Sequence, residues 1–97
     1  MHYKIVLSPE AVRDRRQLQA YDRAIVDDAM ERHLRYEPTK VSKSRIKRLR
    51  GLAKPHYRLR VEDFRVFYDV SGNEVQILAI VAKTDVDRWL EEVGELE

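Results

Sequence analysis

Three arginines occupy one side of the predicted hairpin between His56 and Asp69, which reads HYRLRVEDFRVFYD. Strand side chains alternate between two faces, so a turn at Glu62-Asp63 would put Arg58, Arg60 and Arg65 on the same face. Like charges directly across a strand pair are destabilising, so folding alone does not favour this arrangement. An anionic partner such as a phosphate would explain it, because arginine binds phosphate through two parallel hydrogen bonds.

The register of this hairpin decides how close the arginines come. A two-residue turn pairs Val61 with Phe64, Arg60 with Arg65, and Arg58 with Phe67. One face of the hairpin is then core, and the other holds the guanidiniums beside an aromatic ring. The Glu-Asp turn lacks the glycine or asparagine that such hairpins favour, so a longer loop with a different register stays open.

Two further side chains could join this face and move protons. If residues 71–73 (Ser-Gly-Asn) form a three-residue loop, Arg65 lies opposite Ala79 and Lys83 falls on the arginine face. Crowding by guanidiniums is the condition under which a lysine amine gives up its proton and acts as a base. His56 shares the parity of the arginines and could act as general acid or base. The alternative is that His56 is only a surface residue at a strand entrance.

Basic residues are concentrated in one part of the chain. Residues 38–61 hold nine of the 19 Lys and Arg side chains and none of the 17 Asp and Glu side chains, although the net charge is only +2. This density indicates a polyanion binder, with a solvated basic loop as the alternative. The candidate RNA-binding residues are Lys43, Arg45, Lys47, Arg48, Arg50, Lys54 and Trp89. Trp89 could stack on a base or anchor the last helix to the core.

The elements that position these residues follow from apolar periodicity and capping signals. Strands are predicted at 3–7, 56–61, 64–70 and 75–82, and helices at 9–18, 22–36 and 85–93. Residues 39–53 form a basic connector, with a short helical turn predicted at 44–49. Ser8 and Pro9 mark the start of the first helix. The fold class is therefore α+β, with two N-terminal helices packed on a mostly antiparallel four-stranded sheet and a short C-terminal helix. This is a two-layer sandwich in a single domain over residues 1–97.

Composition excludes several classes of site. The chain has no cysteine, which rules out disulfides and thiolate metal sites. Its three histidines lack metal-ligand spacing, and there is no glycine-rich phosphate loop, so we expect no metal and no cofactor. The apolar run near the start is too short for a signal peptide or a membrane span. A soluble cytoplasmic protein without a membrane partner is expected.

Four segments carry a resemblance to a known family. They are YKIVLSPEAVRD at the start, LRGL before the hairpin, YRLRVEDFRVFYDV in the hairpin, and VQILAIVAK in the last long strand. In this order the chain resembles the RelE/ParE superfamily of toxins from bacterial type II toxin–antitoxin pairs, over nearly its whole length.

The resemblance implies a function and its residues. The RelE-like branch consists of ribosome-dependent mRNA endonucleases, and members are neutralised by an antitoxin that wraps the toxin. Arg58 and Arg60 match positions that are usually basic, Arg65 matches an arginine, and Lys83 matches the basic position after the last strand. The resemblance thus implies metal-independent mRNA cleavage by 2′-hydroxyl attack. The implied partners are mRNA and ribosomal RNA on the ribosome and an acidic antitoxin in a hetero-oligomer.

Two departures leave an alternative open. Active family members often carry an arginine where this chain has Thr84, and a catalytic tyrosine in a basic tail near the place of Trp89 and Leu90. Here the tail is acidic. The alternatives are a ParE-like toxin that acts on DNA gyrase, or a homologue that binds RNA or antitoxin without efficient cleavage.

Overall fold

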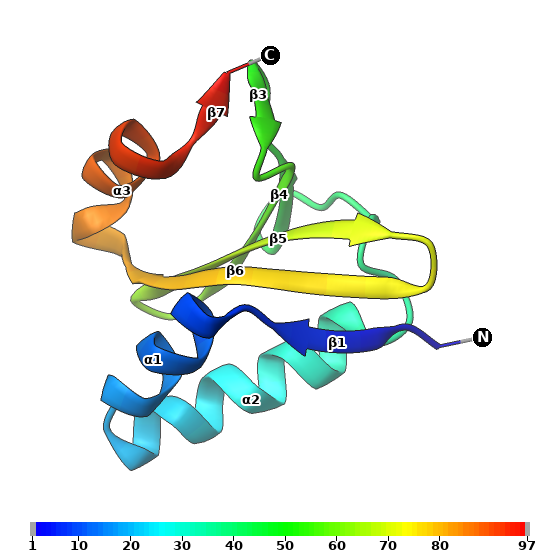
Figure 1. Cartoon of the computed structure of the whole chain (residues 1–97). Coiled ribbons are helices and arrows are strands. Elements are labelled where there is room, and N and C mark those ends of the chain that lie inside the picture. Colours follow the sequence, from blue (N-terminus) through cyan, green and yellow to red (C-terminus); the bar gives the residue numbers. More distant parts are fainter. Residues whose placement is uncertain (1, 97) are drawn as a thin grey trace.

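A five-stranded sheet separates two N-terminal helices from a third helix (Figure 1). The computed structural model describes residues 2–96. Its elements are β1 (Lys4–Leu7), α1 (Pro9–Gln17), α2 (Ala20–Leu34), β2 (Ile46–Arg48), β3 (Leu52–Lys54), β4 (Tyr57–Val61), β5 (Phe64–Ser71), β6 (Glu74–Ala82), the 3₁₀ turn η1 (Lys83–Asp85), α3 (Val86–Val93) and β7 (Glu95–Leu96). Helices α1 and α2 lie on one side of the sheet, and α3 lies on the other with a small β3–β7 ribbon. Within residues 2–96 no helix is long and apolar enough to cross a membrane.

The α+β class is confirmed, but the predicted sheet of four strands was wrong by one strand. The strand order is β1-β6-β5-β4-β2, with β1 parallel to β6 and the other neighbours antiparallel. The additional strand is β2, where a helical turn was expected. Ile46 is buried against the core and pairs with Leu59. Ser42 covers part of the unpaired edge of β2. Its N–H donates to the Ile46 carbonyl, and its hydroxyl accepts from the Arg45 and Ile46 N–H groups.

Side chains of α1 fix that helix to β6. Ser8 caps the helix as predicted, accepting from the Ala11 N–H at 3.1 Å. The same hydroxyl donates to the Leu78 carbonyl at 3.0 Å, and Asp14 accepts from the Ile80 N–H at 3.0 Å. These contacts satisfy backbone groups of β6 beyond the end of β1, where no strand pairs with them.

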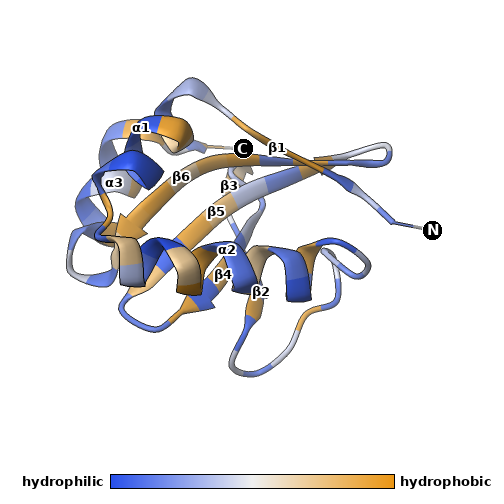
Figure 2. Cartoon of the chain, turned by 90° about the horizontal axis from the view of Figure 1, so that it is seen from below, coloured by the Kyte–Doolittle hydropathy of each residue, from blue (hydrophilic) through white to orange (hydrophobic). Residues whose placement is uncertain are grey.

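The second helix lies across the sheet and covers its lower face (Figure 2). It begins at Ala20, two residues before the predicted start at Asp22, which therefore lies in the first turn. Its buried residues are Val26, Ala29, Met30 and Leu34, which pack on inward-facing residues of β4, β5 and β6. The helical apolar stripe predicted these contacts.

The first hairpin has the predicted register. Val61 pairs with Phe64, Arg60 with Arg65, and Arg58 with Phe67. Glu62 makes the tight turn possible by adopting a φ of 51°, in the left-handed region that favours glycine. The strand pattern therefore prevailed over the unfavourable turn sequence.

The second hairpin has a different register from the one predicted. Gly72 and Asn73 form a two-residue turn with Ser71 opposite Glu74, and Gly72 has the positive φ that such turns use. A bulge then shifts the pairing between Phe67 and Tyr68. Arg65 consequently lies opposite Val81 and not opposite Ala79. The two-residue turn and the bulge each shift the register by one residue. Together they shift it by two, so the residues of β6 beyond the bulge lie on the face that was predicted for them.

Tyr68 joins the sheet to the start of the basic connector. It is fully buried, and its hydroxyl donates to the Pro38 carbonyl at 2.6 Å. Burial raises the pKa of Tyr68 well above its ordinary value, so the phenol keeps the proton that it donates. On its other side the ring stacks on Tyr57, with centroids 5.4 Å apart.

We expect Tyr68→Phe to lower the free energy of unfolding by about 1–2 kcal/mol, because the buried Pro38 carbonyl loses its donor. Urea denaturation measures this change. As the matched control, Tyr57→Phe keeps the stacked ring and should cost less than about 0.5 kcal/mol. Equal losses in the two variants would contradict the role of the hydroxyl.

Candidate phosphate-binding site

The predicted arginine face exists, on the side of the sheet away from α1 and α2. We call this side the outer face. Leu59, Val61 and Val66 point into the helix-side core, so alternation places Arg58, Arg60 and Arg65 opposite. Across the sheet, Arg58 lies between Lys47 of β2 and Phe67 of β5.

Helix α3 covers only part of the outer face. Trp89 stacks on Phe67 with centroids 4.6 Å apart and planes 19° from parallel. Val86 and Leu90 of α3 pack on the same small cluster, together with Leu49 from the segment after β2. Trp89 is thus the anchor of the last helix, and its side chain stays partly exposed.

The three arginines influence one another electrostatically. Burial lowers the pKa of Arg58, and the charges of Arg65 and then Arg60 lower it further. Burial also lowers the pKa of Arg65, as does Arg60, while Asp63 opposes the shift. Both groups remain cations, because arginine does not deprotonate in proteins. The repulsion between them is a cost that the folded chain carries.

Arg58 is the most enclosed of the three. It is half-buried, and among residues 2–96 its Nε is the one buried side-chain nitrogen or oxygen that has no hydrogen-bond partner. Within the described part of the chain, no carboxylate forms an ion pair with Arg58, Arg60 or Arg65. A buried donor without an acceptor costs free energy, so an anion reaching this guanidinium would be bound strongly.

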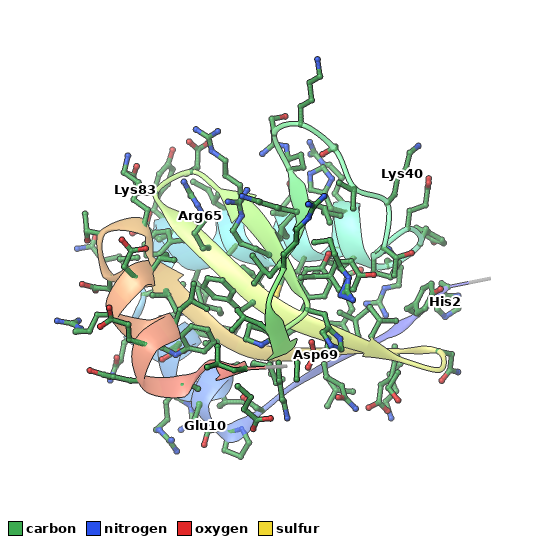
Figure 3. The ribbon with its side chains drawn as sticks, turned by 90° about the horizontal axis from the view of Figure 1, so that it is seen from above. His2, Glu10, Lys40, Arg65, Asp69 and Lys83 are labelled. Atoms are coloured by element: carbon green, nitrogen blue, oxygen red, sulfur yellow. The ribbon has the colours of Figure 1, made fainter. Side chains whose placement is uncertain are left out.

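Arg65 has a second role at the hairpin turn. One of its terminal nitrogens donates to the Glu62 carbonyl at 2.9 Å and to the Phe64 carbonyl at 2.8 Å. These bonds hold the left-handed turn from outside and fix the guanidinium in place. Figure 3 shows Arg65 and Lys83 at the same end of the sheet.

Lys83 lies at the tip of the hairpin. Its N–H donates to the Asp63 carbonyl at 2.8 Å, and its amine lies 3.5 Å from a carboxylate oxygen of Asp63. Arg45, Arg60 and Lys83 line a shallow pocket of about 330 Å³ at this tip. Ser44, Glu62 and Asp63 complete its lining. The structure therefore brings Lys83 to Arg60 and Arg45, with acidic groups between them, while Arg58 lies farther down β4.

His56 directly precedes β4 and lies at the end of the outer face away from Lys83. Its backbone N–H donates to Asp69 Oδ1 at 2.6 Å, and its ring Nδ1 lies 3.6 Å from the same oxygen. Asp69 was missed as a site residue, although the register that pairs Arg58 with Phe67 also places Asp69 opposite His56. Extending the predicted pairing by one step would have found it.

The basic connector does not form a single surface. Lys47 lies on the outer face beside Arg58. Arg48 lies on the opposite face, where its guanidinium stacks over the Tyr57 ring at 5.4 Å. Lys43, Arg50 and Lys54 are exposed along the connector and β3. Within residues 2–96 no group of His, Asp and Glu side chains is arranged to hold a metal ion.

A family model described as the ParE toxin of the type II toxin–antitoxin system parDE matches residues 5–85 of the chain. This span includes both hairpins, all three arginines and Lys83. No curated protein sequence matches the chain.

Solved structures agree with the observed fold. A chain of the archaeal RelE–RelB complex from Pyrococcus horikoshii OT3 is 25% identical with a TM-score of 0.63, over 86% of this chain and 97% of that one. The RelBE2 toxin–antitoxin complex from Mycobacterium tuberculosis gives 23% identity and a TM-score of 0.65, over 84% and 99%. The YoeB dimer from Staphylococcus aureus gives 17% identity and a TM-score of 0.61, over 84% and 97%.

Relief of repulsion between the arginines should be measurable as stability. We expect Arg60→Gln to raise the free energy of unfolding by about 0.5 kcal/mol at low salt, because Arg60 lies directly across from Arg65. Salt should shrink the gain, since exposed charges are screened. Urea denaturation at two salt concentrations measures it. Arg13→Gln is the control, because Arg13 faces Glu10 and not another cation. A loss of stability in Arg60→Gln would contradict the repulsion.

Proposed function

The chain belongs to the ParE toxin family of type II toxin–antitoxin systems, within the RelE/ParE superfamily, and we propose that it is a ribosome-associated mRNA endonuclease. The observation that supports this proposal is the outer face, where three arginines cluster beside an aromatic pair and, within residues 2–96, no carboxylate forms an ion pair with them. Phosphate groups are among the anions that guanidiniums bind through two parallel hydrogen bonds.

The chemistry that this face can support is metal-independent cleavage. The RNA 2′-hydroxyl attacks the adjacent phosphorus, and charge builds up on the phosphorane oxygens. Arg58 would bind the scissile phosphate, with Arg60 and Arg65 stabilising the developing charge from the same side. Lys83 and Arg45, at the tip pocket, would hold the next phosphate along the strand. Arginine cannot serve as the base, so a different residue must take the 2′ proton.

The surrounding surface would bind the rest of the RNA. Lys47 extends the outer face at its β2 edge, and a base could reach the exposed part of Trp89. Lys43, Arg50 and Lys54 would contact ribosomal RNA. Arg48, on the opposite face, would reach a different segment of RNA or the antitoxin.

The expected partner is an antitoxin that forms a hetero-oligomer with the chain. The similar structures from Pyrococcus horikoshii and Mycobacterium tuberculosis are complexes of a toxin with its antitoxin. An antitoxin for this chain should be acidic where it meets the basic connector. Its binding should therefore weaken as salt concentration rises.

A second candidate is action on DNA gyrase. It is favoured by the acidic α3, which carries Asp87, Glu91 and Glu92, and by Thr84 at a position where nucleases of the superfamily often have arginine. An acidic helix beside the outer face would repel an RNA strand passing over it.

Induced expression with and without the neighbouring antitoxin gene distinguishes the two candidates. The nuclease proposal expects new mRNA 5′ ends within minutes, mapped by sequencing, and a halt of translation before any change in DNA. Intact mRNA together with covalent gyrase–DNA complexes would favour the second candidate and overturn the first.

For the purified chain we expect Arg58→Ala to weaken binding to a short single-stranded RNA about tenfold, because one buried phosphate contact is lost. The slope of the logarithm of affinity against the logarithm of salt concentration should fall by about one. Fluorescence anisotropy measures both. Arg13→Ala, which removes an exposed arginine of α1, should change neither. Equal affinities of the two variants would remove Arg58 from the RNA site.

A further inference from the structure

Resting on this proposed function, we propose that His56 is the general base of the cleavage reaction and that Asp69 is the residue that positions it. The pair lies on the outer face, at the end of the hairpin away from Lys83. Figure 3 places Asp69 along the sheet from Arg65 and Lys83. Proton transfer then takes place beside Arg58 and not at the tip pocket that Arg60 and Lys83 line.

Asp69 is held so that its carboxylate faces the histidine ring. Oδ1 accepts the His56 backbone N–H at 2.6 Å, and the side chain is only 14% exposed. His56 Nδ1 lies 3.6 Å from that oxygen, while the histidine side chain is 38% exposed. At 3.6 Å this is a contact and not a hydrogen bond, and in the proposed reaction the carboxylate would draw the ring proton to Nδ1, which leaves the Nε2 lone pair to accept a proton. It also stabilises the imidazolium that forms.

The spacing along β4 suits a single nucleotide. His56 and Arg58 are two residues apart on the same face, or about 7 Å in an extended strand. A phosphate on the Arg58 guanidinium would therefore have its own 2′-hydroxyl within reach of His56. The tip pocket, which Arg60 lines with Lys83, lies about 13 Å from His56 along the strand, so it would hold the next phosphate while Arg60 contributes its charge to both phosphates.

The charged groups around His56 come from five strands, β2, β3, β4, β5 and β7. Asp69 of β5 lies beside it. Arg58 of β4 comes two residues later in the chain, and Lys47 of β2 pairs with Arg58. On the side toward the β3–β7 ribbon, Lys54 is paired in register with Glu95. Cations lie on the Arg58 side of the ring, and Asp69 supplies a carboxylate beside it. This combination suits a base that begins neutral and becomes charged during the reaction.

The reaction balances with these groups. Nε2 of His56 takes the 2′ proton as the 2′ oxygen forms its bond to phosphorus. The bond from phosphorus to the 5′ oxygen then breaks, and that oxygen takes a proton from water. The products are a 2′,3′-cyclic phosphate and a 5′-hydroxyl, and the imidazolium returns its proton to solvent. Arg58 holds the phosphorane oxygens throughout.

The experiment measures single-turnover cleavage of a defined mRNA in a reconstituted translation system, as a function of pH. His56→Gln should lower the rate about a hundredfold and remove the rise of rate with pH across the range where imidazoles lose their proton. Asp69→Asn should lower the rate at least tenfold, although its amide oxygen can still accept the His56 N–H. Neither variant should change the affinity for RNA, which separates their role from that of Arg58.

His33→Gln is the matched control, because His33 lies on α2 on the other side of the sheet, and it should cleave at the parental rate and with the parental pH profile. If His56→Gln cleaves normally while Arg58→Ala does not, the nuclease proposal stands and the base assignment is overturned. Normal cleavage by Asp69→Asn alone overturns the positioning role. A parental chain that leaves mRNA intact overturns both proposals. Circular dichroism checks the fold, and if His56→Gln fails to fold, the rate and pH profile of Asp69→Asn decide.

Discussion

The pairing of Val61 with Phe64 across a two-residue turn determines which side of the sheet carries the arginines. Side chains alternate along a strand, so a slip of one residue would move the arginines into the helix-side core and bring Leu59 and Val66 to the surface. The hydrophobic core does not tolerate that exchange, which fixes the register even though the turn residue Glu62 must adopt a positive φ. Arg65 reinforces the turn with its two bonds to backbone carbonyls. Arg65 thus belongs to the cation cluster and also stabilises the turn that brings the cluster together.

The arginine face could be predicted from sequence because it depends on one local rule, the alternation of side chains in β4 and β5. The first helix could be predicted for a similar reason, since Ser8 and Pro9 mark its start. The register of β6 could not. Its bulge lies beside Leu78, whose carbonyl is bonded by the Ser8 hydroxyl, and near Ile80, whose N–H is bonded by Asp14. Those bonds join residues far apart in sequence, and no local pattern indicates them.

Short strands were missed for a different reason. β2 and β3 span three residues each and consist largely of basic or exposed side chains, so they leave no apolar period to detect. Their pairing depends on the strands next to them, Tyr57–Val61 and Glu95–Leu96. His56 and Asp69 show the converse case. They are distant in sequence, yet the hairpin register implies their contact, and the chemistry of the pair becomes evident only when both faces of the sheet are assigned.

The two edges of the sheet differ in a way that affects self-association. At the β2 edge, Ser42 occupies both the N–H and the carbonyl of Ile46, so a further strand would find these two groups already bonded. At the opposite edge, β1 has no strand on its outer side within residues 2–96, although Arg35 bonds the backbone of Tyr3. Open edges are the sites at which sheets of different molecules join. Joining two copies through β1 would use up this edge of the five-stranded sheet in each copy, so association through β1 would end at a closed pair.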